Sequence, residues 1–220
     1  MRPRFLWVAG SLLVGAFLAA GSARAQTTQI DSAFFAVLKG TDTIAVETFA
    51  REGHELRGQL VKVAAGRERT RYRAALMDDA STPLVEFSVW KGDDPPNSPA
   101  RQTGRVIFKE DSAAVDEADS RGLRTLMFQT ERGAITYLNL SFALLEQATR
   151  RARTLKQDSV AVPFFNLGGG QTLEGTVLRL TDDSAAVRLG SVEFRLQIDP
   201  AGRIMGGAIP SQSLVVSRSP

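Results

Sequence analysis

The stretch VEFRLQI at residues 192–198 alternates apolar and polar side chains without a break. Side chains on an extended chain point to opposite faces in turn, so its four apolar residues share one face and its three polar residues share the other. This period of two predicts a β-strand with one buried face and one face in water.

The same period recurs elsewhere in the chain. In RTRYRAAL (69–76) three arginines alternate with Thr70, Tyr72 and Ala74, and VEFSV (85–89) repeats the pattern. Turn-forming dipeptides and loops of Gly, Asp, Asn and Pro separate such stretches at short intervals. Short strands with frequent turns are typical of antiparallel hairpins arranged as a meander, a sandwich or a barrel. The turn signals lie at 52–53, 65–66, 78–79, 92–97, 182–183 and 199–202.

One segment has a different period. From Leu138 to Lys156 the apolar residues recur every three or four positions, which predicts an amphipathic helix of about five turns. Asn139 or Ser141 can cap its start, because a short polar side chain accepts a bond from a free backbone N–H. Basic residues close to its end suit the carbonyl end of the helix dipole. These are Arg150, Arg151, Arg153 and Lys156.

The expected fold is therefore mainly β. We predict a curved antiparallel sheet or half-barrel in a single domain, built from a meander at 26–137, the helix at 138–156 and a second meander at 157–220. Short echoes link the meanders: DTIAV (42–46) resembles DSVAV (158–162), and DSAAV occurs at both 111–115 and 183–187. Shared hairpin chemistry explains such echoes, and an ancient duplication is the alternative.

The first 25 residues have the features of a signal peptide. Arg2 and Arg4 precede an uncharged apolar run at 5–21, and Ala23-Arg24-Ala25 provides a cleavage site of the A-x-A type. The mature protein is then expected to begin at Gln26 and to be periplasmic or extracellular. An uncleaved membrane anchor is the alternative, at the lower limit of spanning length.

Charge and cysteine content narrow the possibilities. The signal region holds three of the 27 basic residues and no acidic one, so 24 basic and 24 acidic residues remain in the other 195. A neutral chain is not typical of a nucleic-acid-binding protein. The absence of cysteine excludes disulfides and a lipid-modified cysteine. A domain of this length needs no disulfides, because its core buries enough surface.

Two combinations of residues suggest catalysis only weakly. His54, the single histidine, lies in a polar junction between strands, and no G-x-S-x-G motif accompanies it. Ser88 and Lys91 match S-x-x-K, but residues three apart on a strand point to opposite faces. We therefore predict no catalytic site, with a hydrolase that uses Ser88 and Lys91 as a remote alternative.

Other motifs are better explained as structure. Gly168-Gly169-Gly170 lacks the Lys and Ser/Thr of a phosphate loop and fits a hairpin. The aspartate pairs at 78–79, 93–94 and 182–183 lack the spacing of a calcium loop, so we predict no metal and no cofactor. The basic residues at 150–156 are expected to form a solvated helix face, with docking on anionic lipid as the alternative.

In its pattern of strands with one long amphipathic helix, the chain resembles the periplasmic half-barrel carriers of lipids and lipoproteins (the Lol type). This resemblance implies a hydrophobic cavity for an acyl chain or another apolar ligand, covered by the helix. Its expected lining consists of aromatic residues, which in other folds are ordinary core: Tyr72, Phe87, Phe108, Tyr137, Phe142 and Phe194.

Three classes of function stay open at this point. The first is an exported, non-catalytic carrier of an apolar or lipid-like ligand. The second is an interaction module that contacts a membrane or envelope proteins through sheet edges and has a solid core. The third is the hydrolase. The sequence specifies neither the ligand nor the oligomeric state.

Overall fold

The computed structural model describes residues 30–63, 67–92, 94–95 and 97–220, so the predicted signal peptide lies outside the described residues. Within them the chain forms fifteen strands, one α-helix and a short 3₁₀ turn at Pro210–Gln212. The first nine strands are β1 (Asp31–Lys39), β2 (Asp42–Glu52), β3 (Glu55–Lys62), β4 (Glu68–Ala75), β5 (Leu84–Lys91), β6 (Gln102–Phe108), β7 (Ser112–Asp119), β8 (Gly122–Gln129) and β9 (Ile135–Tyr137). After helix α1 (Phe142–Leu155) come β10 (Ser159–Asn166), β11 (Gln171–Arg179), β12 (Ser184–Leu189), β13 (Val192–Ile198), β14 (Ile204–Ile209) and β15 (Leu214–Ser219).

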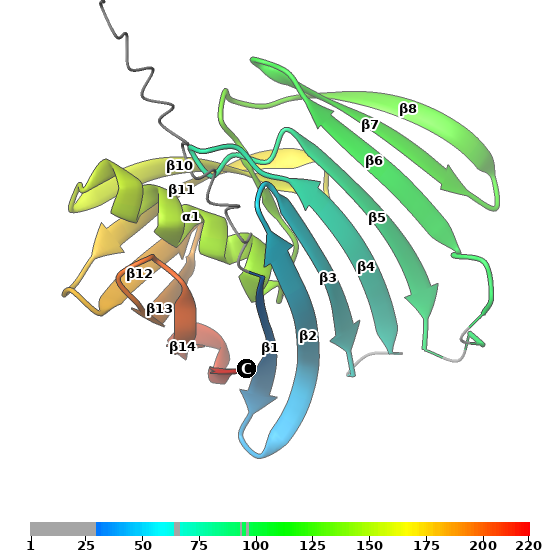
Figure 1. Cartoon of the computed structure of the whole chain (residues 1–220). Helices are drawn as coiled ribbons and strands as arrows, with labels where there is room; N and C mark the ends of the chain where they lie inside the picture. Colours follow the sequence, from blue (N-terminus) through cyan, green and yellow to red (C-terminus); the bar gives the residue numbers. More distant parts are fainter. Residues whose placement is uncertain (1–29, 64–66, 93, 96) are drawn as a thin grey trace, which may run out of the picture.

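All fifteen strands belong to one curved sheet, in the order β8-β7-β6-β5-β4-β3-β2-β1-β15-β14-β13-β12-β11-β10-β9 (Figure 1). The first and last strands, β1 and β15, pair with each other near the middle of the sheet. Its two edges are β8 and β9, which follow one another along the chain. Every pairing is antiparallel except β9 with β10, which is parallel.

The order of the strands brings the two sheet edges together at one end. Only residues 130–134 separate β8 from β9, and so few residues span at most about 20 Å. At this end Thr172 Oγ1 of β11 donates to the Gln129 carbonyl oxygen at 3.2 Å, and the rings of Phe128 and Phe165 lie 5.9 Å apart. The sheet is thus almost closed at the end of β8 and open along the rest of that strand.

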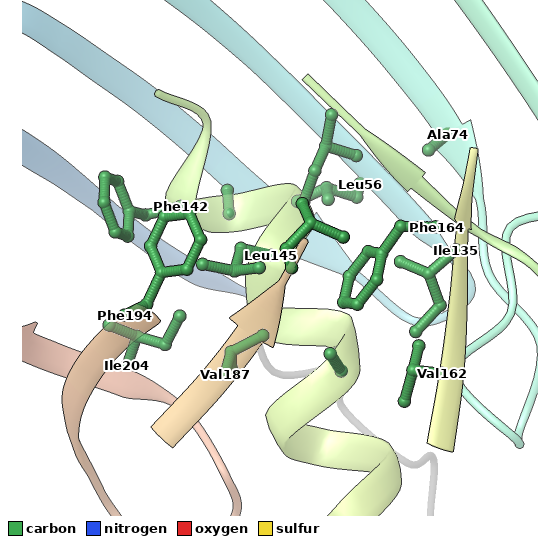
Figure 2. Close-up of a cluster of buried hydrophobic side chains, with 14 of the residues drawn as sticks. Leu56, Ala74, Ile135, Phe142, Leu145, Val162, Phe164, Val187, Phe194 and Ile204 are labelled. Atoms are coloured by element: carbon green, nitrogen blue, oxygen red, sulfur yellow. The ribbon is translucent and has the colours of Figure 1, made fainter. Parts of the chain in front are cut away.

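Helix α1 lies within the curve of the sheet, where it contacts β2, β9, β10, β11, β12 and β14 (Figure 1). Its apolar residues pack with those of the strands into one core, in which Phe142, Leu145 and Phe164 are almost fully buried (Figure 2). The predicted mainly-β fold, a curved antiparallel sheet with one long helix on its concave side, is confirmed.

The predicted start of the helix is wrong by four residues. Ser141 is the N-cap and its side chain accepts a bond from the Leu144 N–H, so α1 begins at Phe142. Before it, Leu140 has a φ of 70°, which no helix residue adopts. Leu138 and Leu140 continue the apolar pattern because they pack on the core from the preceding turn.

Glycines on the concave face make room for aromatic rings from neighbouring strands. A Cβ atom at Gly58 would lie 2.2 Å from the Tyr72 ring, and one at Gly104 would lie 2.3 Å from the Phe87 ring. Gly175 and Phe164 repeat the arrangement. These rings therefore lie flat over the sheet and shield its backbone.

The sequence echoes occur at positions that are not equivalent in the fold. The DSAAV at 111–115 leads into β7, four strands after β3, whereas the one at 183–187 leads into β12, directly after β11. Gly58 pairs with Phe49, but its counterpart Gly175 pairs with Val162 rather than with Phe165. This arrangement favours shared hairpin chemistry over duplication.

Candidate functional site

The six aromatic residues expected to line a cavity all belong to the core or pack against it. Tyr72, Phe87, Phe142 and Phe194 are between 1% and 8% exposed, and Phe108 and Tyr137 are half-buried. Their neighbours are other rings: Phe142 contacts Phe194 with centroids 6.2 Å apart, and Phe108 contacts Phe165 at 5.3 Å. These aromatic side chains are thus part of the core or its border.

Two larger depressions lie on the convex face of the sheet. They measure about 550 and 540 Å³ and share Glu86, Phe87 and Ser88 in their linings. Arg57, Arg71 and Ser88, which border the first, have side chains on the face opposite the core. Tyr72 and Phe87 border it only from behind, because their rings point into the core.

Glu47 of β2 is a buried acid that sequence reasoning missed. It is fully buried, and its Oε1 accepts bonds from the Tyr72 hydroxyl at 2.6 Å and from the Ser141 hydroxyl. Its Oε2 accepts the backbone N–H groups of Phe142 at 2.7 Å and Ala143 at 2.9 Å. The carboxylate thus joins β2, β4 and the start of α1, where the helix dipole favours negative charge.

Burial raises the pKa of Glu47, and the bonds from Ser141, Tyr72 and the helix amides offset part of this rise. The signal in the sequence was a single acid at an inward position of an otherwise apolar alternation, Ala45-x-Glu47-x-Phe49. The arrangement positions a helix and leaves no lone pair of the carboxylate free for a substrate.

A second group of charges links the first strand, the last strand and the helix. We call Asp31, Arg51, Glu146, Arg150 and Arg218 the ion cluster. Arg218 of β15 donates to Asp31 at 2.7 Å and to Glu146 at 2.8 Å, and Arg150 donates to both acids at 2.9 and 2.8 Å. Glu146 also accepts the Ile204 N–H at 2.9 Å. Burial lowers the pKa of Arg51 to about 10.

The expectation that residues 150–156 present a solvated basic face is wrong. Arg150 is part of the ion cluster, and Arg151 is only 8% exposed, with its Nε donating to the Asp79 carbonyl oxygen at 2.8 Å. Arg153 donates to the Asp182 carbonyl oxygen, which leaves Lys156 exposed as the C-cap. The helix end faces the sheet and its turns, so most of its basic side chains find partners within the fold.

The residues considered for catalysis do not converge. Ser88 of β5 lies on the convex face, and Lys91 points to the other face of the same strand. His54 lies in the β2–β3 turn, where its Nδ1 is 3.2 Å from the Leu76 carbonyl oxygen and 4.0 Å from Asp78. Ser88, Lys91 and His54 therefore do not share a cleft.

The glycine run and the aspartates lie in turns. Gly168-Gly169-Gly170 forms part of the turn between β10 and β11, while Asp78-Asp79 and Asp182-Asp183 lie between strands. Of the pair at 93–94, Asp93 lies outside the described residues and Asp94 bonds Arg101. In the described part of the chain, no three His, Asp or Glu side chains gather as metal ligands do.

Edge strand β8 is the most exposed strand of the sheet's first half. Leu123 is 76% exposed and Met127 is 63% exposed, and both lie on the convex face. The Thr130 N–H donates to the opposite Asp111 carbonyl oxygen at 2.9 Å. In an antiparallel pair every second residue bonds the neighbouring strand, so the even-numbered residues of β8 bond β7. The backbone groups of Leu123, Thr125 and Met127 therefore point away from β7.

Comparison with solved structures places the chain among barrel-like β folds. It is similar to a DUF1089 family protein from Pseudomonas aeruginosa, with a TM-score of 0.54 and 14% identity over 76% of this chain and 91% of that one. It is also similar to a β-barrel-like protein of the domain of unknown function DUF1849 from Brucella abortus, with a TM-score of 0.53 and 9% identity over 87% and 95%. No family model and no curated protein matches the sequence.

At such low identity the two likenesses establish the fold alone. The resemblance to Lol-type carriers stays a prediction. Among the described residues, no helix has both the length and the apolar character that crossing a membrane requires.

Proposed function

We propose that the protein is a non-catalytic interaction module that binds an extended segment of a partner protein along strand β8. The observation that carries this proposal is the free edge: the N–H and C=O groups of Leu123, Thr125 and Met127 point away from the sheet, beside exposed apolar side chains. Adding a strand to such an edge satisfies these groups, and side-chain contacts provide the specificity.

The form of the edge supports this proposal. Proteins usually protect edge strands with proline, lysine, a β-bulge or a covering segment. Strand β8 has eight residues in unbroken register with β7, and it contains neither proline nor lysine. Its one charge, Arg124, is paired with Glu117 at 2.7 Å. A regular, partly apolar edge of this kind fits a binding role.

The packing of the aromatic residues favours this function over the carrier function. Of the six aromatic residues expected to line a lipid cavity, Phe142 and Phe194 pack against each other, and Phe108 and Tyr137 pack against Phe165 and Phe164. Tyr72 and Phe87 lie over Gly58 and Gly104. The two larger depressions lie instead on the polar convex face. Because the predicted signal peptide implies export, we propose that the partner is a protein of the bacterial envelope.

A short segment suits the edge better than a second copy of the chain. The end of β8 is covered by the β10–β11 hairpin, where Thr172 bonds the Gln129 carbonyl oxygen and Phe128 lies against Gly170. In a symmetric antiparallel pair, the hairpins of both copies would compete with the incoming strand. Residues 122–127 stay accessible to a peptide that ends before the hairpin.

The test is selection of linear peptides from a random library against the chain from residue 26. Recovered peptides should carry apolar residues at alternate positions, to match Leu123 and Met127. Met127→Pro removes one free N–H from the edge and should weaken peptide binding at least about tenfold, the loss expected for a bond and its neighbours. Met127→Leu keeps both the N–H and the apolar contact, so it should bind as the unmodified chain does.

Peptides that bind Met127→Pro and the unmodified chain equally well would contradict the proposal, as would failure to recover any peptide. Light scattering at increasing concentration provides a second criterion. A dimer that Met127→Pro dissociates would show that a second copy occupies the edge, which would overturn the proposed partner class.

A further inference from the structure

The two depressions on the convex face join into a single groove, which we call the convex groove. Glu86 and Ser88 line both of them, so the depression of about 550 Å³ continues directly into the one of about 540 Å³. Residues of β2 to β5 line the first, and residues of β5 to β8 line the second. Because β2 to β8 follow one another in the sheet (Figure 1), the convex groove crosses these strands and ends at the free edge.

The strand register explains the position of the groove. Outward-facing residues that pair on neighbouring strands form rows across the sheet, and the row that starts at Leu123 contains mostly small, uncharged residues. It continues through Ala118, Thr103 and Ser88 and, beyond Arg71 and Gln59, ends at Thr48. Small side chains between longer ones leave a depression, so this row is the floor of the convex groove.

Longer side chains border the floor on both sides. On one side Arg73 and Arg105 are each paired with an acid, at 2.6 and 3.0 Å, and Glu86 lies between them in the register. On the other side the guanidinium carbon of Arg71 lies 5.3 Å from the centroid of the Trp90 ring. The charges along the groove are thus paired or stacked within the protein, so we do not expect the groove to select a charged ligand.

The floor offers hydrogen-bonding groups that the fold does not use. The hydroxyls of Thr48, Ser88 and Thr103 have no hydrogen-bond partner within the described residues. A hydroxyl both donates and accepts, so it can bond either the N–H or the C=O of a peptide unit. A groove with such groups and no excess charge therefore suits the main chain of an extended peptide.

The convex groove is continuous with the edge at which we place the partner segment. Leu123 belongs both to the free stretch of β8 and to the lining of the second depression, and it is 76% exposed. The β10–β11 hairpin covers β8 near Gln129, so a bound segment has room to continue past the other end of the strand, at Leu123. A segment that leaves the edge there meets the groove directly.

We propose that the partner segment continues from β8 over Leu123 into the convex groove, which makes the ligand a long peptide rather than a single strand. This inference rests on the proposed function and extends it. About six residues would pair with 122–127, and the crossing from β8 to β2 covers about 29 Å, or about nine extended residues. The expected segment has alternating apolar residues at one end and small or uncharged polar residues along the rest.

The test selects random linear peptides of about 20 residues, long enough for both parts, against the chain from residue 26. Thr103→Trp places a bulky side chain on the groove floor, two strands from the edge. It should weaken binding of the recovered peptides at least about tenfold, because they lose contacts and hydrogen bonds along the floor. Ser217→Trp, at an exposed outward position of β15, is the matched control and should bind as the unmodified chain does.

Shortened peptides separate the groove from the edge. A peptide trimmed to the residues that pair with β8 should bind more weakly than the long one and should bind Thr103→Trp and the unmodified chain equally, which also shows that the variant is folded. Long peptides that Met127→Pro weakens and Thr103→Trp does not would overturn this inference and leave the proposed function standing. Long peptides that neither variant weakens would overturn both.

Cross-linking locates the rest of the segment. A benzophenone group placed at each terminus of the long peptide in turn should, at one of them, cross-link to residues 48–59 of β2 and β3. Cross-links from both termini that stay within β8 and the β10–β11 hairpin would contradict a path along the convex groove.

Discussion

A carboxylate without contact with water needs its lone pairs occupied by donors. Glu47 has four such donors, two hydroxyls at one oxygen and two backbone N–H groups of α1 at the other. It therefore fixes where the helix begins relative to β2 and β4. Replacing Glu47 by glutamine changes only its charge and one acceptor, so this variant separates its contribution to stability from that of the surrounding apolar core.

Glu47→Gln should destabilise the protein by about 1–3 kcal/mol, because the amide NH₂ would face one of the two donor pairs and leave it without an acceptor. Urea unfolding followed by circular dichroism measures this change. Glu86→Gln, on the exposed convex face, is the control and should unfold at the same urea concentration as the unmodified chain. Equal stability of the two variants would contradict the role given to Glu47.

The pKa of Glu47 also predicts how stability changes with pH. Burial raises this pKa in the folded state, so folding is coupled to proton uptake at this group. Its contribution to stability is fully present below the unfolded value of about 4.3 and is lost as the pH rises through the raised folded pKa. The free energy of unfolding of the unmodified chain should thus fall above pH 4 relative to that of Glu47→Gln. Parallel pH profiles would contradict this assignment.

At the scale of single elements, strand β8 allows a test of which backbone groups are free. Leu126→Pro removes an N–H that bonds β7 and should cost about 1–3 kcal/mol, whereas Met127→Pro removes one that faces away and should cost clearly less. Thermal unfolding of the two variants compares neighbouring positions of similar size. Equal losses would mean that the edge is not oriented as described.

The elements also show what the sequence could and could not predict. The alternation at 192–198 predicted β13, and Phe194, Leu196 and Ile198 are indeed its buried residues. The helix was predicted from its period, but the start was wrong because Leu138 and Leu140 continue that period from a turn. Periodicity reports which face is buried and does not report where a chain reverses.

The surroundings of the candidate site residues could not be predicted, because they depend on strand order. The inward direction of Phe87 follows from alternation, but whether its ring lines a cavity or covers Gly104 depends on the neighbouring strand. Beside Glu146 on its own helix, Arg150 has a partner on β1, Asp31, and the Arg151 side chain bonds the Asp79 carbonyl oxygen. Neither Asp31 nor Asp79 is near the helix in sequence. Likewise, nothing in residues 122–129 marks them as an edge.

At the scale of the whole molecule, β1 and β15 join the two halves of the sheet, and the ion cluster connects both strands with α1. Arg218→Met should therefore destabilise the entire fold by about 3–5 kcal/mol, because it leaves the buried Glu146 and the half-buried Asp31 short of a partner. Equilibrium unfolding should stay a single transition at lower denaturant. Arg195→Met, on an exposed pair with Glu193, should leave the transition in place; a similar shift in both variants would contradict the role of the cluster.

The free edge of β8 unites the fold with the proposed function, and amide hydrogen exchange of residues 122–129 tests it most directly. In the protein alone, we predict that the amides of Leu123, Thr125 and Met127 exchange fast and those of Arg124, Leu126 and Phe128 exchange slowly. A selected peptide should slow the first three and leave the others unchanged. Slow exchange of the first three amides without a partner, or fast exchange in the presence of a bound peptide, would contradict the account.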